Sequence, residues 1–313
     1  MPISPSDNHE IITGVFYLDH SPGIVARLYR AAAPVVMQSG LLNRCNFAFW
    51  YKDERSVAPN GWTCTPNAHA WVREVTSTDM IRADSPLFPT DEVEAAFIEP
   101  VRRTRTYPIG EGPCSLSVRG KGDSFEHSPV IVVLTIDPVH AHKRDIDVRK
   151  LVNDFTSVLG DGHGCFYGFI DTCTAAECEF TLLYKFNTIA TVRRQLEENL
   201  YRSEGPNRAN YVRNVYWGNY LGPGLAKRFD PTGELAAQFA AGTDPDWDPS
   251  TEEPGIPGYT QYVQKTADGG LFLAMSESPM TWAEVGGGNL GFGESADLAL
   301  WVHRQFRDKG MLL

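Results

Sequence analysis

Apolar residues near the start of the chain are spaced first as in a strand and then as in a helix. Residues 12–20, ITGVFYLDH, are typical of a strand. After Ser21 and Pro22 a helical period begins, with apolar positions at Ile24, Val25, Leu28, Tyr29, Ala32, Val35 and Val36. We expect Ser21 to be the N-cap, with Pro22 tolerated in the first turn.

The middle of the chain repeats this order. Residues 130–136, VIVVLTI, form a continuous β-branched run, which predicts a strand buried on both faces and ended by Asp137 and Pro138. An amphipathic helix closed by Gly160 then has its apolar positions at Val148, Leu151, Val152, Phe155, Val158 and Leu159. The elements expected next are strands over 164–171 and 179–186 and a helix with Val192, Leu196 and Leu200.

An aromatic stretch in the last third, NVYWGNY at 214–220, alternates as a strand does. It would offer Val215, Trp217 and Tyr220 to a core, and Gly218 would mark a bulge or a close backbone approach. LGPG then turns the chain into a helix whose stripe holds Leu221, Leu225 and Phe229. The last expected elements are a strand in GGLFLAMS and a helix from about Ser295 with Leu298, Trp301, Val302 and Phe306 inward.

These elements predict an α+β fold with a mixed or antiparallel sheet and packed amphipathic helices. The repeated strand–helix order suggests two related halves. We expect one large domain over 1–313, and the alternative is a division into 1–120 and 121–313.

Charge and composition narrow the class of partner. The formal net charge is −11, so the chain repels nucleic acid and attracts basic partners. No apolar run approaches the length of a membrane span, and no secretory signal is visible, so we expect a cytoplasmic protein. The six cysteines are sparse, which favours reduced thiols over disulfides.

Three residue patterns resemble known cofactor or metal sites. GGGNLG at 286–291 matches the dinucleotide fingerprint, but the second strand and the acidic residue that the fingerprint needs do not follow, so we interpret it as a loop. His163, Cys165, Cys173 and Cys178 are close enough in sequence to suggest a zinc site. Their spacing is irregular for such a site, and the alternative is that the cysteines are small buried thiols. His140 and His142 with Asp137 could bind a metal, and a polar loop explains them equally. With no catalytic motif present, we predict no enzyme, no catalytic residue, no cofactor and no metal.

One motif adds a resemblance. VYWGNYLGPGL, followed by GGLFLAMSESP at 269–279, resembles the type VI secretion immunity family and polymorphic-toxin immunity proteins with a tryptophan–glycine motif. The residues that carry it are Tyr216, Trp217, Gly218, Asn219, Leu221 and Gly222, with the segment Gly270–Pro279. The resemblance implies a non-catalytic inhibitor of one toxin, a restriction-endonuclease-like nuclease. It identifies no binding residues, and we interpret the motif as a scaffold.

An acidic segment is the expected partner surface. Its residues are Asp244, Asp246, Trp247, Asp248, Glu252 and Glu253, and no Lys or Arg occurs from Phe229 to Gln264. An acidic inhibitor can compete for a nuclease's basic, phosphate-binding cleft, and Trp247 would be an anchor. The alternative is a solvated loop. The other function classes left open are an enzyme of unrecognised type and a structural or assembly protein of the secretion apparatus, and self-association also stays open.

Overall fold

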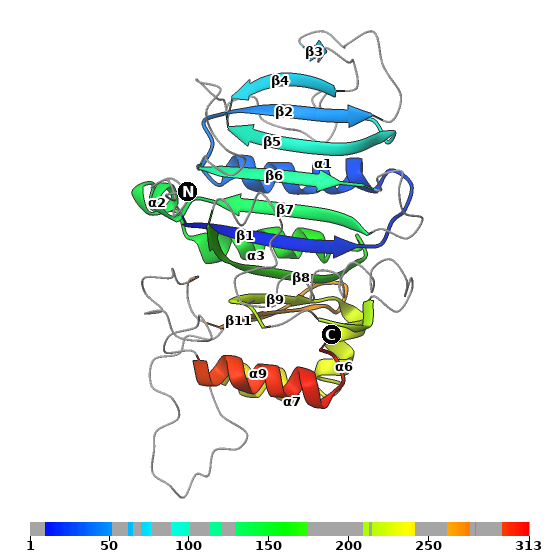
Figure 1. Ribbon diagram of the computed structural model, residues 1–313, viewed down its shortest axis with the longest axis vertical. Helices are drawn as coiled ribbons and strands as arrows, with labels where there is room; N and C mark the ends of the chain where they lie inside the picture. Colours follow the sequence, from blue (N-terminus) through cyan, green and yellow to red (C-terminus); the bar gives the residue numbers. More distant parts are fainter. Residues whose placement is uncertain are drawn as a thin grey trace, which may run out of the picture.

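An antiparallel sheet dominates the computed structural model (Figure 1). The structure describes residues 10–51, 62–64, 70–76, 89–100, 113–120, 129–174, 209–212, 215–241, 262–275, 279 and 296–312. The strands are β1 (Glu10–Leu18), β2 (Arg44–Tyr51), β3 (Thr63–Cys64), β4 (Ala70–Thr76), β5 (Val93–Pro100), β6 (Cys114–Arg119), β7 (Val130–Ile136), β8 (Cys165–Thr174), β9 (Gly218–Leu221), β10 (Tyr262–Lys265) and β11 (Leu271–Ala274). The helices are α1 (Ile24–Gln38), α2 (Pro138–Lys143), α3 (Val148–Leu159), α6 (Pro223–Phe229), α7 (Glu234–Ala241) and α9 (Ala296–Asp308).

Within these residues eleven strands form one sheet, in the order β10-β11-β9-β8-β1-β7-β6-β5-β2-β4-β3. The central strand β1 pairs antiparallel with β7 on one side and with β8 on the other, so Val15 lies opposite both Val133 and Phe169. The α+β class is confirmed, and the sheet is antiparallel in every pairing between these strands. The relation between two halves stays a prediction.

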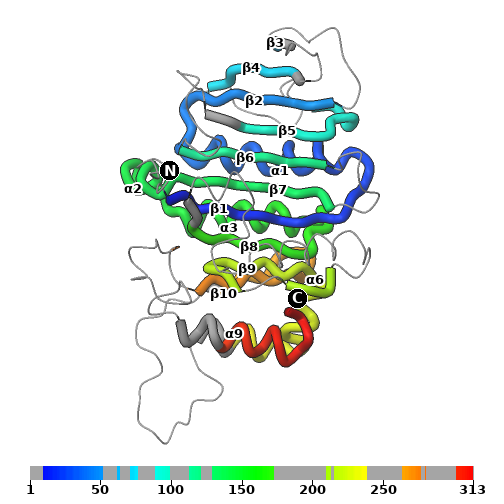
Figure 2. The backbone as a smooth tube through the Cα atoms, in the orientation of Figure 1, coloured from blue at the N-terminus to red at the C-terminus, as the bar shows by residue number. Residues whose placement is uncertain are grey.

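Helices α1 and α3 lie side by side on one face of the sheet (Figures 1 and 2). The Phe155 ring of α3 packs on Phe16 of β1 at 5.6 Å between centroids. The ring of Tyr29 in α1 makes an edge contact with Phe49 of β2 at 5.1 Å. These buried aromatic contacts join both helices to the core, since each aromatic ring removes a large apolar area from water.

The predicted start of the first helix was wrong by two residues. Gly23, not Ser21, is the N-cap of α1, and no side chain makes a capping hydrogen bond at this end of the helix. The Ser21 hydroxyl instead accepts a hydrogen bond from Arg27 at 2.7 Å, and the Ser21 carbonyl accepts one from the Ile24 N–H. The serine is therefore engaged in the turn that leads into the helix.

Strand β7 spans the predicted residues 130–136 but is not buried on both faces. Val130, Val132, Leu134 and Ile136 are buried, whereas Ile131 and Val133 are partly exposed. Figure 1 shows the reason, because α1 and α3 cover one face and no described helix crosses the other face at β5, β6 and β7.

The C-terminal elements extend the sheet beyond β8. Strands β9 and β11 follow β8, and helices α6, α7 and α9 gather at this end of the molecule (Figure 1). Phe229 of α6 and Phe306 of α9 meet edge to face at 5.5 Å and are both buried. Within the described residues, no helix is both long and apolar enough to cross a membrane.

Candidate functional site

The residues of the tryptophan–glycine motif lie in the core at the junction of β9 and α6. Tyr216, Trp217, Asn219 and Leu221 are all buried, and the Asn219 side chain is fully so. Its Oδ1 accepts a hydrogen bond from the Tyr216 N–H at 3.1 Å, and its Nδ2 donates one to the Tyr216 carbonyl at 2.7 Å. Asn219 thereby pairs with two backbone groups of a buried residue, as buried polar groups require.

The two glycines of the motif are closely surrounded, Gly222 by backbone and Gly218 by side chains. A Cβ on Gly222 would overlap the backbone of β8, lying 2.6 Å from the Phe166 Cα, and the Gly222 N–H donates to the Phe166 carbonyl at 3.0 Å. A Cβ on Gly218 would lie 3.0 Å from the Phe272 ring, so side chains and not the backbone that was predicted approach this glycine. The strand itself begins only at Gly218, because Tyr216 is held in a turn by Asn219. This corner has little surface to offer a partner.

Several predicted positions lie outside the described residues. They are the acidic segment with Asp244, Asp246, Trp247, Asp248, Glu252 and Glu253, the GGGNLG loop at 286–291, the elements expected over 179–200, and Cys178. The acidic segment therefore stays a prediction.

Asp137 and His140 are brought together at the start of α2. Asp137 is the N-cap, and its Oδ1 accepts hydrogen bonds from the Val139 and His140 N–H groups at 2.8 and 3.1 Å. The His140 Nδ1 lies 2.7 Å from Asp137 Oδ2. Helix capping accounts for this pair, and within the described residues no group of three His, Cys, Asp or Glu side chains is placed to hold a metal ion.

The described thiols are poorly suited to nucleophilic chemistry. Cys45, Cys114 and Cys165 are free and buried. Burial raises the pKa of Cys45 to about 12 and also raises the pKa values of Cys114 and Cys165. Burial lowers the pKa of the half-buried His163, with Arg27 acting in the same direction and Asp161 opposing it. Since thiolates and not thiols attack or bind metals, these cysteines act as core residues.

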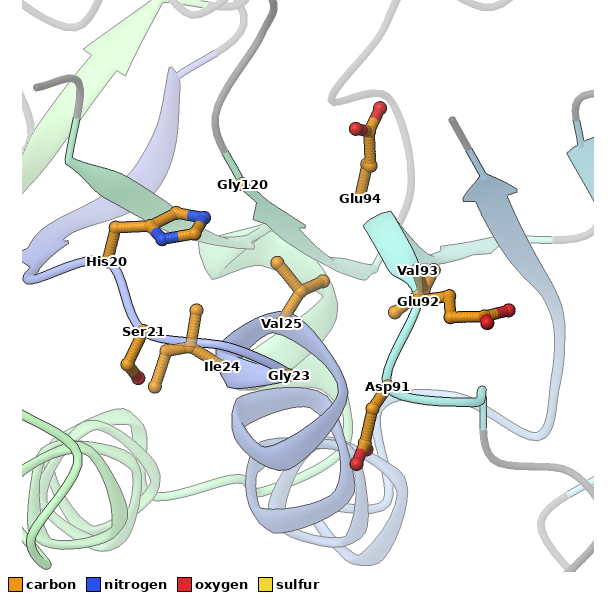
Figure 3. Close-up of a pocket in the computed structure, with 10 residues that line it drawn as sticks. All are labelled: His20, Ser21, Gly23, Ile24, Val25, Asp91, Glu92, Val93, Glu94 and Gly120. Atoms are coloured by element: carbon orange, nitrogen blue, oxygen red, sulfur yellow. The ribbon is translucent and has the colours of Figure 1, made fainter. Parts of the chain in front are cut away.

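An acidic hollow of about 290 Å³ opens where α1 begins (Figure 3). Three segments line it, namely the turn from β1 into α1, the start of β5, and Gly120 at the end of β6. The lining residues are His20, Ser21, Gly23, Ile24, Val25, Asp91, Glu92, Val93, Glu94 and Gly120. The Gly120 N–H donates to the Glu94 carbonyl at 2.7 Å, which holds the end of β6 against the start of β5.

The charged side chains in the lining of this hollow are carboxylates. Its lining holds three carboxylates, Asp91, Glu92 and Glu94, and neither Lys nor Arg. Two arginines lie beside the lining: Arg30 is 3.4 Å from Asp91, and Arg27 donates a hydrogen bond to the Ser21 hydroxyl at 2.7 Å. Figure 3 shows the carboxylates fanning outwards from the start of β5 and not converging on one point. This arrangement suits a broad positive surface better than a single ion, because a metal requires ligands directed at one centre.

Sequence reasoning missed this hollow. The run Asp91-Glu92-Val93-Glu94 was the available signal, but its neighbours in the hollow come from residues about seventy positions earlier and from Gly120. Nothing in the local pattern indicates that these segments meet.

The chain was compared with protein families, curated proteins and solved structures. No protein-family model matches the chain, and no curated protein matches it. Among solved structures, the chain is similar to the Pseudomonas aeruginosa T6SS protein PA0821, with 10% sequence identity and a TM-score of 0.44. The match covers 85% of this chain and 65% of that one, so this chain spans less than two thirds of that protein's length.

Proposed function

We propose that this chain is an immunity protein that binds a cognate type VI secreted toxin, a nuclease, and protects the cell that produces it. It acts in the cytoplasm by occupying the toxin, without catalytic turnover and without a cofactor. The sequence resemblance at Tyr216–Gly222 and the net charge of −11 support this role. The observation that carries it in the structure is the hollow at the start of α1, whose lining has carboxylates and no Lys or Arg.

Charge is the physical basis of the proposed inhibition. A nuclease binds phosphates with Lys and Arg side chains, so its cleft is basic. Carboxylates spread along the edge of a hollow can take the place of phosphates, and opposite charges speed the encounter of the two proteins. Asp91, Glu92 and Glu94 would form one such surface, and the segment Asp244–Glu253 would form another.

The scaffold and the binding surface are separate in this proposal. The motif residues are buried around Asn219, whereas Asp91 and Glu92 are exposed. A change in the motif should therefore lower stability, and a change at the hollow should lower affinity.

Co-expression with the toxin encoded beside this chain's gene tests the role. We expect the two proteins to co-purify and the chain to restore growth. If they neither co-purify nor rescue growth, the proposal is rejected.

The surface is tested by E92Q/E94Q, with E234Q/D308N as a control that removes the same charge from exposed positions in α7 and α9. We expect slower association and a weaker salt dependence for the first variant than for the control. Replacing Asp244, Asp246, Trp247 and Asp248 together gives the same test for the acidic segment. If association is unchanged in every variant, the interface lies elsewhere.

A further inference from the structure

A second concave surface lies between the C-terminal half of α1 and helix α3, which run side by side on the sheet (Figure 2). This interhelical groove has a volume of about 650 Å³, within the range of protein binding sites. Its lining residues are Val35, Gln38, Ser39, Asp145, Ile146, Asp147, Lys150, Leu151, Asp154, Ser157 and Val158.

The floor of the interhelical groove is apolar. Leu151 is buried, and Val35, Ile146 and Val158 are partly exposed. Val35 and Ile146 pack against the main core, so the floor is an extension of the core that reaches solvent. An apolar side chain that covered it would gain free energy by removing both surfaces from water.

The rim of the groove is acidic. It holds Asp145, Asp147 and Asp154 against one cation, Lys150, which donates a hydrogen bond to Asp154 Oδ2 at 2.6 Å. Arg144, beside the rim, donates from its Nη1 to the Gly40 carbonyl at 2.7 Å and so is held toward the end of α1. Asp147 also caps α3 by accepting from the Lys150 N–H at 2.8 Å. The lining residues thus carry two more negative charges than positive ones.

We infer that the interhelical groove docks an amphipathic helix of the partner protein, with its apolar side on the floor and its Lys or Arg residues against the rim. Two neighbouring helices form a furrow into which the side-chain ridge of a third helix fits. Helix-in-groove recognition uses the same combination of an apolar floor and a charged margin. The identity of the partner as the toxin rests on the proposed function, whereas the groove and its charge do not.

A defined peptide tests the groove without the toxin. The probe is a synthetic helix of about 18 residues, with Leu on one face and Lys on the other, and its matched control carries Glu in place of Lys. Binding to the full chain is followed by NMR of the Ile, Leu and Val methyl groups. We expect the Lys peptide to shift the methyl resonances of Ile146, Leu151 and Val158, and the Glu peptide to leave them unchanged.

Variants then locate the charge effect. D145N/D154N removes two rim carboxylates and leaves the Asp147 cap intact. Asn at position 145 tolerates the positive φ of 55° that the backbone has there. We expect this variant to weaken binding of the Lys peptide about fivefold, since exposed ion pairs contribute a few tenths of a kcal/mol to about 1 kcal/mol each. E234Q/D308N, with the same change in net charge, should weaken it less than twofold.

The outcomes separate this inference from the proposed function. The inference is overturned if the methyl shifts fall elsewhere, if the Glu peptide binds as well as the Lys peptide, or if both variants weaken binding equally. It is also overturned if the toxin is bound and neutralised equally well by D145N/D154N. If the Lys peptide binds in the groove while the toxin does not bind the chain at all, the groove stands and the proposed immunity role falls.

Discussion

Replacing Asn219 by Ala should destabilise the protein by about 3 kcal/mol. The fully buried Asn219 side chain makes two hydrogen bonds, one with the N–H and one with the carbonyl of Tyr216. Alanine makes neither bond and leaves both backbone groups buried without these partners. Each such loss costs about 1–3 kcal/mol, so the two together give the stated magnitude after partial relaxation.

The assay is equilibrium unfolding in urea, with the free energy of unfolding obtained from the midpoint and slope. Asn210→Ala is the matched control, because Asn210 is exposed and should change stability by less than about 0.5 kcal/mol. Under conditions where both variants are folded, Asn219→Ala should bind the partner as tightly as the unchanged chain. The reasoning is refuted if the two variants unfold at the same urea concentration, or if Asn219→Ala is stable but loses binding.

Three further predictions concern close packing, thiol titration and helix capping. Gly222→Ala should destabilise the protein by more than about 2 kcal/mol, because the added methyl group would overlap the backbone of β8. Its control is Gly224→Ala in α6, where the methyl group would face open space and should be neutral or stabilising by up to about 1 kcal/mol. Equal urea midpoints for the two variants would contradict this. Burial raises the pKa of Cys45 to about 12, so above pH 9 the thiol ionises in the unfolded chain but keeps its proton in the folded one. The free energy of unfolding should therefore fall between pH 9 and 12. Urea titrations at several pH values should show a shallower fall for Cys45→Ala. Asp137→Ala removes the N-cap of α2 and should lower the stability by about 1–2 kcal/mol, measured by thermal unfolding. His140→Ala should lower the stability less, and the reverse order would argue against a capping role for Asp137.

Helices and strands whose apolar residues follow a strong period were predicted well from the sequence. The helical stripe from Val148 to Leu159 became α3 with both ends as expected, and the β-branched run at 130–136 became β7. The last helix, expected from about Ser295, begins at Ala296. The strands β2 to β6 and β10 were missed, although β6 alternates Cys114, Leu116 and Val118 with polar residues. Such short alternations are weak signals in isolation, because a strand becomes stable only when it is paired.

The candidate binding surfaces depend on segments that meet only in the folded chain. The acidic hollow needs the turn before α1, the start of β5 and the end of β6, and the interhelical groove needs α1 beside α3. For the hollow, strand pairing brings the segments together, since β6 pairs with both β5 and β7.

The sequence by itself determined the α+β class, the net negative charge, and the helices and strands whose apolar period is strong. It also marked the buried corner at Trp217, where aromatic residues and glycines are concentrated. Only the tertiary structure decided that β1 lies between β7 and β8, that one face of β7 is partly exposed, and that carboxylates line a hollow. The physical reason is that periodicity reflects which side of an element is buried, whereas the choice of neighbour depends on contacts between distant residues, which leave no mark in a local pattern.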